Sequence, residues 1–168
     1  IMGPAPEPAL WEVDANLRPE GKDGPLVRTV ESYVQYYKRW AENWEFQALL
    51  KARPIAGSAQ LGARYARAID PFVWESAARE SFVESVQAMR ARVTDNIPSH
   101  QVDRQIKLGP GGLRDIEFTV QLLQLVHGRT DPAVRTKSTV DSLASLTAVS
   151  YISRTDAEAF SRDYKKLR

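Results

Sequence analysis

The sequence predicts a mainly α-helical bundle preceded by a single β-strand. From residue 30 to residue 168, apolar residues recur mostly at steps of three and four, which is the period of amphipathic helices. A short segment before them alternates apolar and polar residues instead, which is the period of a strand with one buried face. The 168 residues are 43% hydrophobic and 26% charged, which is typical of a globular chain.

The predicted strand runs from about Trp11 to Arg18 and is ended by Pro19 and Gly21. A lone strand cannot satisfy its backbone groups or bury its apolar face, so we expect its sheet to lie upstream, in sequence outside these residues. Residues 1–27 are then the edge of one truncated domain, and residues 28–168 are a helical domain cut at its C-terminus. The chain is expected to be a fragment of a longer protein.

Helices follow in order, and each is placed by its apolar period and its end signals. Thr29 and Ser58 are suitable N-caps, Pro71 is expected to restart a helix, and Gly128 is expected to stop one. Thr155 and Glu158 match a capping box. The expected ranges are 30–51, 58–68, 71–94, 113–127, 139–149 and 155–168.

The composition excludes several classes of function. The absence of cysteine excludes disulfides, thiolate metal sites and cysteine catalysis, and two histidines argue against a histidine-rich metal site. A net charge of +2 without a basic stripe argues against nucleic-acid binding. No apolar run approaches the length of a membrane span and no signal peptide opens the chain, so we expect a cytoplasmic protein without membrane contact.

Two polar features near the predicted strand could carry chemistry. Asp14 lies on the strand's polar face, where a carboxylate could hold Mg²⁺ in a phosphoryl-transfer site or simply be solvated. Arg18 and Lys22 lie in a turn with two glycines, which could meet phosphate oxygens or be an ordinary connection to the first helix.

A third feature is the charged group that follows the glycine-rich segment 109–112. Arg114 and Glu117 are three residues apart on one predicted helix face, and Asp115 lies in the first turn, where negative charge is favourable. These charges could complement the helix dipole, tie helices together as an ion pair, or hold a nucleotide or partner beside the glycine loop.

Three segments taken together resemble one enzyme family, glutamine synthetase adenylyltransferase, also called adenylyl-tyrosine phosphorylase. The resemblance covers the chain from about residue 11 to residue 168, and it is closer to the amino-terminal, de-adenylylating half of the family. The segments that carry it are Val13–Gly21 (VDANLRPEG), Trp44–Pro54 (WEFQALLKARP) and Gly111–Phe118 (GGLRDIEF) with Gln121.

The resemblance implies a polymerase-beta-like nucleotidyltransferase fold, in which a Gly-Ser turn and an Asp-x-Asp pair precede a third carboxylate on a later strand. Asp14 matches the third carboxylate and is implied to be catalytic and a metal ligand, while the other two elements are absent from this sequence. Arg18, Lys51 and Arg53 are implied phosphate contacts. Arg114, Asp115 and Glu117 are implied to border the active site or join the helical domain to the catalytic palm. The helical domain is expected to be akin to that of PII-uridylyltransferases.

The implied reactions of the parent enzyme are transfer of AMP from ATP to a tyrosine of glutamine synthetase, which releases pyrophosphate, and removal of that AMP by phosphate, which yields ADP, with Mg²⁺ as cofactor. We expect the isolated fragment to be inactive, because one carboxylate cannot hold two metal ions. The alternative is a helical interaction module that binds glutamine synthetase or the PII signal protein without catalytic residues of its own.

Overall fold

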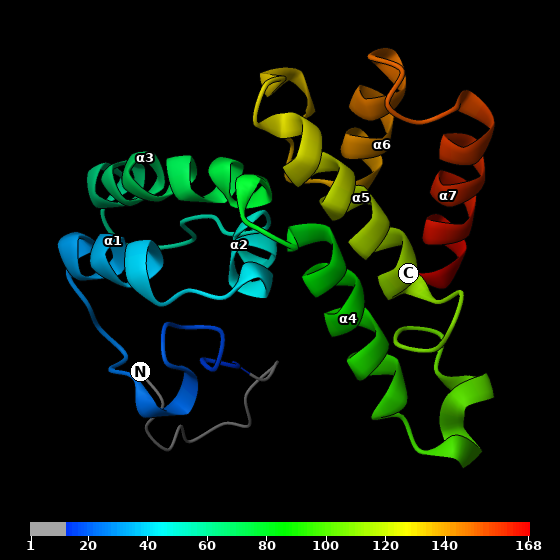
Figure 1. Ribbon diagram of the computed structural model, residues 1–168, viewed down its shortest axis with the longest axis horizontal. Coiled ribbons are helices and arrows are strands. Elements are labelled where there is room, and N and C mark those ends of the chain that lie inside the picture. Colours follow the sequence, from blue (N-terminus) through cyan, green and yellow to red (C-terminus); the bar gives the residue numbers. More distant parts are fainter. Residues whose placement is uncertain (1–12) are drawn as a thin grey trace.

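The computed structural model describes residues 13–168, and within this range the regular structure is helical (Figure 1). Short 3₁₀ turns connect several of the helices, and none of the described helices is long and apolar enough to cross a membrane. The α-helices are α1 (Val30–Arg39), α2 (Asn43–Leu49), α3 (Ala59–Glu75), α4 (Phe82–Asp95), α5 (Leu113–Gly128), α6 (Thr139–Ala148) and α7 (Arg154–Leu167).

The predicted strand is wrong wherever the structure describes it. Residues 13–15 have no regular structure, and residues 16–20 form turns that lead into a 3₁₀ helix at Gly21–Asp23. Val13 and Leu17, two of the residues assigned to a buried strand face, are 62% and 66% exposed. An alternating segment becomes a strand only beside a partner strand, and the described residues offer none. Residues 11 and 12 of the predicted strand lie outside the described range.

The helix predicted for residues 30–51 is broken into two. Thr29 caps α1 as expected, because its hydroxyl oxygen accepts a hydrogen bond from the Ser32 backbone N–H at 3.2 Å. The chain then leaves the helix at Trp40 and restarts as α2, where the Glu45 carboxylate accepts from the Glu42 backbone N–H at 2.9 Å. The periodicity continued across the break because Ala41 and Phe46 are both buried in the same core.

The break predicted between residues 68 and 71 is also wrong. Ser58 caps α3 as predicted, but α3 continues through Pro71 to Glu75, and the chain breaks at residues 76–81. Pro71 removes one helix hydrogen bond, yet Val73 and Trp74 beyond it are buried on the face of α3 that already buries Ile69. Burial of that face outweighs the local preference of proline.

The last three helices agree with the predictions apart from their ends. The cap of α7 is Ser153, whose hydroxyl oxygen accepts from the Asp156 backbone N–H at 3.0 Å, and not Thr155. Ser153 and Asp156 have the same spacing as the capping box assigned to Thr155 and Glu158, so the pattern alone did not distinguish them.

Two hydrophobic cores flank α5, which lies between the remaining helices (Figure 1). The first core packs α1 to α4 against the α5 residue Leu125, and the second packs α6 and α7 against Ile116 and Val120 of α5. Gly128 at the end of α5 permits the close contact with α3, because a Cβ atom there would lie 2.7 Å from Cζ3 of Trp74. Residues far apart in the sequence therefore meet along α5.

Candidate functional site

Asp14 is exposed in the segment without regular structure that precedes the turns at residues 16–20, and it is not held on a strand. Its Oδ1 accepts a hydrogen bond from the Asn16 backbone N–H at 2.8 Å, which leaves Oδ2 without a partner among the described residues. Among the side chains that the structure describes, no group of three or more histidine, cysteine or acidic residues is placed to hold a metal ion. Asp14 can supply one metal ligand, so the described residues alone do not fit a two-metal site.

Arg18 closes the turn that follows Asp14. Its guanidinium donates to the backbone carbonyls of Ala15 at 2.7 Å, Gly24 at 2.9 Å and Lys22 at 3.1 Å. Gly24 is required for this closure, because a Cβ atom there would lie 2.1 Å from the Pro19 carbonyl oxygen. With its donors directed at these carbonyls, Arg18 holds the turn in shape, and its role as a phosphate contact stays a prediction.

Lys51 lies just after α2 and reaches across to the start of α6. Its Nζ donates to the Lys137 carbonyl at 2.8 Å and to the Thr139 hydroxyl at 3.0 Å. Burial lowers the pKa of the Lys51 ammonium, and the nearby Glu117 carboxylate opposes this by raising it. Two of its three donors are therefore used to hold the N-terminus of α6.

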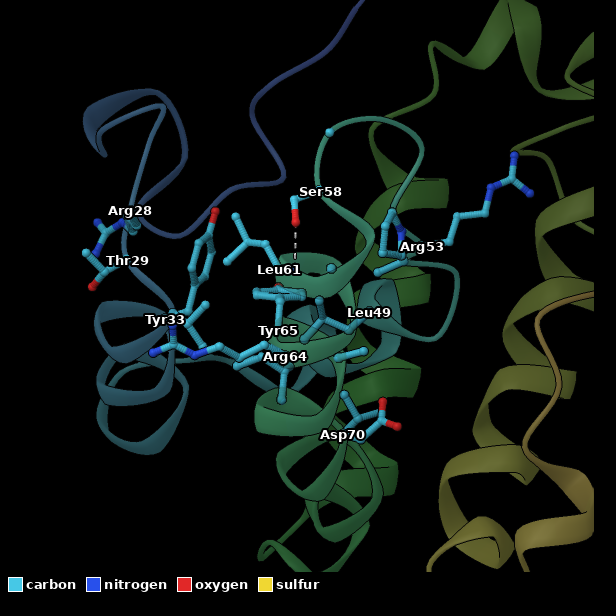
Figure 2. Close-up of a pocket in the computed structure, with 18 of the residues that line it drawn as sticks. Arg28, Thr29, Tyr33, Leu49, Arg53, Ser58, Leu61, Arg64, Tyr65 and Asp70 are labelled. Carbon is cyan, nitrogen blue, oxygen red and sulfur yellow. Dashed lines mark hydrogen bonds between the residues drawn. The ribbon is translucent and has the colours of Figure 1, made fainter.

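Arg53 differs from Lys51 and Arg18 because it is exposed and its side chain has no hydrogen-bond or ion-pair partner among residues 13–168. It lines a pocket between α1, α3 and the loop that joins α2 to α3, and lies at the opposite end of this pocket from Arg28 and Thr29 (Figure 2). Of the three cations predicted to contact phosphate, Arg53 is the one with a free guanidinium.

Asp115 ties the glycine-rich loop to α4 and α5. Its Oδ1 accepts from Nε of Arg90 at 2.6 Å, and its Oδ2 accepts from the Gly111 backbone N–H at 2.6 Å. Arg90 also donates to the carbonyls of Leu108 at 3.1 Å and Gly109 at 3.2 Å. Of the interpretations open from the sequence, the structure shows an ion pair that joins two helices.

The same loop does not present a phosphate cradle. The Leu113 and Arg114 backbone N–H groups, at the N-terminus of α5, donate to the carbonyls of Ile106 at 2.9 Å and Lys107 at 3.0 Å. Gly112 N–H donates to the Gly109 carbonyl at 3.0 Å. The amides that would have to meet an anion already have partners within the loop.

Glu117 links α5 to α7. Its Oε2 accepts from Nη1 of Arg114 at 3.0 Å, as their spacing predicted, and its Oε1 accepts from the Tyr164 hydroxyl at 3.3 Å. The Glu117 side chain is 16% exposed, whereas that of Arg114 is 38% exposed. Glu117 therefore lies within a helix junction, at the edge of which Arg114 is accessible.

Comparison with known proteins identifies the family. The chain is 65% identical over its full length to the bifunctional glutamine synthetase adenylyltransferase/adenylyl-removing enzyme of Leifsonia xyli subsp. xyli. Enzymes of the same description from Streptomyces coelicolor and Mycobacterium bovis are 60% and 58% identical over 96% and 95% of the chain. The chain belongs to the glutamine synthetase adenylyltransferase family. It spans 16–17% of the length of these three relatives.

Two family models match different parts of this adenylyltransferase-family chain. Residues 2–68 match the model described as glutamate-ammonia ligase adenylyltransferase, and residues 87–168 match the one described as GlnD PII-uridylyltransferase. The first match includes α1 and α2, and the second includes α5 to α7. The expected likeness to the helical domain of PII-uridylyltransferases is therefore confirmed at the level of sequence family.

Two glutamines to which the sequence assigned no role, Gln47 and Gln121, join these two segments of the adenylyltransferase-family chain. Nε2 of Gln47 donates to Oε1 of Gln121 at 2.9 Å, and both side chains are buried although they are 74 residues apart. Gln47 and Lys51 are one helical turn apart, so the same face of the α2 segment contacts α5 and the start of α6. The only signal for this contact in the sequence was that Gln47 lies within Trp44–Pro54 and that Gln121 accompanies Gly111–Phe118.

Proposed function

We propose that this chain is part of an enzyme that transfers AMP to and removes AMP from a tyrosine of glutamine synthetase. The 65% identity over the whole chain to an enzyme of that description carries the proposal. The likeness of Val13–Gly21 to the segment that holds the third carboxylate of nucleotidyltransferases supports it. The chain belongs to the amino-terminal half of the parent, which removes AMP by phosphorolysis and yields ADP.

Asp14 supplies one ligand to Mg²⁺ in the parent enzyme, and the remaining ligands come from residues outside this chain. The free Oδ2 and the exposure of Asp14 support this role, because its carboxylate is not committed to an internal ion pair. Mg²⁺, when bound, neutralises the charge on the transferred phosphoryl group. The isolated chain is inactive, because one carboxylate does not complete such a site.

Arg53 contacts the phosphate groups, since its guanidinium is free and exposed. Lys51 and Arg18 act less directly, through the helix terminus and the turn that they hold. Arg114, Asp115 and Glu117 maintain the junction between the helical domain and the catalytic palm.

The experiment uses the intact parent protein. AMP-modified glutamine synthetase is incubated with phosphate and Mg²⁺, and ADP release is followed for the wild type and for Asp14→Ala. We expect release to fall at least 100-fold with the circular dichroism spectrum unchanged, because a lost metal ligand removes transition-state stabilisation. Unchanged release would place Asp14 outside the phosphorolysis site. Asp23→Ala, which alters an acidic residue in the next turn, is the matched control and should retain activity.

A second candidate function is supported by the match of residues 87–168 to a PII-uridylyltransferase model. In this case the helical domain binds glutamine synthetase or the PII signal protein and has no catalytic residue. Arg114→Ala separates the two, because Arg114 is accessible at the edge of the junction. Loss of binding with an unchanged turnover number would favour the interaction module, and loss of turnover at saturating substrate would favour a role at the active site.

A further inference from the structure

The turn that follows Asp14 packs on the helical domain beside α1 (Figure 1). The Pro19 side chain is less than 2% exposed, so the turn is not extended into solvent at this point. The Glu20 backbone N–H donates to the hydroxyl of Tyr36 on α1 at 3.5 Å, which is a long hydrogen bond. Residues 18–20 are therefore anchored to the helices rather than being a loose connection to them.

A second contact on the same turn is made by Arg28, which directly precedes the N-cap of α1. Its guanidinium pairs with the Glu20 carboxylate and lies 5.8 Å from the centre of the Tyr36 ring, and its side chain is only 11% exposed. Glu20 has a φ of 64°, in the left-handed region that residues other than glycine seldom adopt. Such a conformation persists only where surrounding contacts hold it, so we expect the turn to relax when they are weakened.

Tyr36 is itself fixed by a buried carboxylate of α2. Its hydroxyl donates to Oε1 of Glu45 at 3.0 Å, and Glu45 is only 5% exposed. The same oxygen accepts from the Glu42 backbone N–H at 2.9 Å, which holds Glu45 in the first turn of α2. Burial raises the pKa of the Tyr36 hydroxyl, so it stays protonated and donates to Glu45 while its oxygen accepts from Glu20. A path of contacts thus runs from α2 through α1 to the turn.

The anchored turn is connected to Asp14 by hydrogen bonds over a few residues. Arg18 donates from Nη1 to the carbonyl of Ala15, the residue next to Asp14, at 2.7 Å. The Arg18 carbonyl accepts from the Gly21 backbone N–H at 2.9 Å, which closes the turn. The Asp14 carboxylate accepts from the Asn16 backbone N–H at 2.8 Å. A shift of the turn would therefore displace the Asp14 carboxylate.

We infer that Tyr36 is a positioning residue for the Asp14 carboxylate, because together with Glu45 it fixes the turn from which Asp14 extends. This role rests on the proposed function, in which Asp14 supplies a ligand to Mg²⁺. Tyr36 acts through the turn and contacts neither metal nor substrate. Active-site groups must be held within about 0.5 Å of their productive positions, so the junction of α1 and α2 sets how well Asp14 binds the metal.

The first test measures the Mg²⁺ requirement of ADP release in the intact parent. Tyr36→Phe removes only the hydroxyl, and the matched control is Tyr33→Phe, one helical turn earlier on α1, whose hydroxyl has no hydrogen-bond partner among the described residues. We expect Tyr36→Phe to slow release about tenfold and to raise the Mg²⁺ concentration for half-maximal release at least about threefold, with Tyr33→Phe unchanged. A general structural defect would reduce the amount of active enzyme without changing its Mg²⁺ requirement. An unchanged requirement in Tyr36→Phe would overturn the inference.

Combination with Asp14→Ala shows whether Tyr36 acts through Asp14. In that background, Tyr36→Phe should slow ADP release by less than about twofold, because the carboxylate that it positions is already missing. An equal loss in both backgrounds would mean that Tyr36 acts elsewhere, and the positioning role would be wrong.

Hydrogen exchange gives a readout of the turn that does not involve ADP release. In the intact parent, we expect the amides of Gly21, Asp23 and Gly24, which are bonded within the turn, to exchange at least about fivefold faster in Tyr36→Phe and not in Tyr33→Phe. Equal exchange in the two variants, with release reduced by Asp14→Ala, would overturn the inference alone. Unchanged release in Asp14→Ala would instead defeat the proposed function and the inference with it, so the two failures are distinguishable.

Discussion

Replacement of Asp115 by alanine tests whether this residue is chiefly a structural lock. The change removes the two hydrogen bonds that the carboxylate accepts, one from Arg90 and one from the Gly111 backbone N–H. Arg90, whose side chain is 13% exposed, then keeps its hydrogen bonds to the loop carbonyls but loses its carboxylate partner. If Asp115 is chiefly structural, its removal should lower the free energy of unfolding even when no substrate is present.

The magnitude follows from the number and the exposure of these bonds. Hydrogen bonds to a charged group contribute about 1.5–3 kcal/mol each, which sets an upper bound of about 3–6 kcal/mol for two. The Asp115 side chain is 38% exposed, and exposed ion pairs contribute only about 0–1 kcal/mol, so the sum must be reduced. We expect a loss of about 2–3 kcal/mol for Asp115→Ala. Asp141→Ala, in the first turn of α6, removes only the favourable interaction with the helix dipole and should cost about 0.3–1 kcal/mol.

Urea unfolding, followed by tryptophan fluorescence and by circular dichroism, measures both variants against the wild type. An unchanged m-value with a lower midpoint would show that stability and not compactness has changed. Hydrogen exchange adds a local readout, because the Gly111 amide should lose its protection in Asp115→Ala alone. If the two variants differ by less than about 0.5 kcal/mol, which is the usual range for a surface substitution, Asp115 is not a lock.

Three further predictions concern the helix contacts. Gly128→Ala should destabilise the protein by about 1–3 kcal/mol in urea unfolding, because the added methyl group would press on Trp74, and a neutral effect would show that α3 and α5 separate easily. Gln47→Leu and Gln121→Leu should each lower the free energy of unfolding by about 1–3 kcal/mol, and the double variant should lower it by less than the sum of the two. Additive losses in this double-mutant cycle would exclude a coupled pair. Burial lowers the folded-state pKa of Lys51, so the unfolded state binds more protons between that lowered value and about 10.4. The free energy of unfolding of the wild type should therefore rise with pH over this interval relative to that of Lys51→Met. A flat difference between the two free energies from pH 8 to pH 10 would contradict this.

The sequence was sufficient to predict where most helices lie but not where the chain breaks between them. The caps at Thr29 and Ser58 are local, since each hydroxyl contacts a backbone N–H three residues later, and both were found from the sequence. The interruption at Trp40 and the continuation through Pro71 depend on burial against other helices, which no local pattern contains. The predicted strand failed for a related reason, because alternation describes a strand only when a partner strand is present.

The candidate site shows the same division between local and long-range contacts. The Arg114–Glu117 pair could be predicted, because three residues of helix place the two side chains together. The contact of Asp115 with Arg90 could not, because the two lie 25 residues apart and Arg90 belongs to no motif. The Gln47–Gln121 bond spans 74 residues and had no sequence signal beyond the shared motifs.

The motif residues therefore divide into two groups by the state of their polar atoms. Lys51, Asp115 and Glu117 are engaged in contacts between helices, so changes at these positions should alter stability as well as activity. Asp14 keeps a free carboxylate oxygen and Arg53 a free guanidinium, both on exposed residues, so changes there should leave unfolding unaltered within about 0.5 kcal/mol. A loss of activity without a loss of stability then marks a residue that acts on the substrate, and a joint loss marks one that holds the helical domain in the shape that the active site requires.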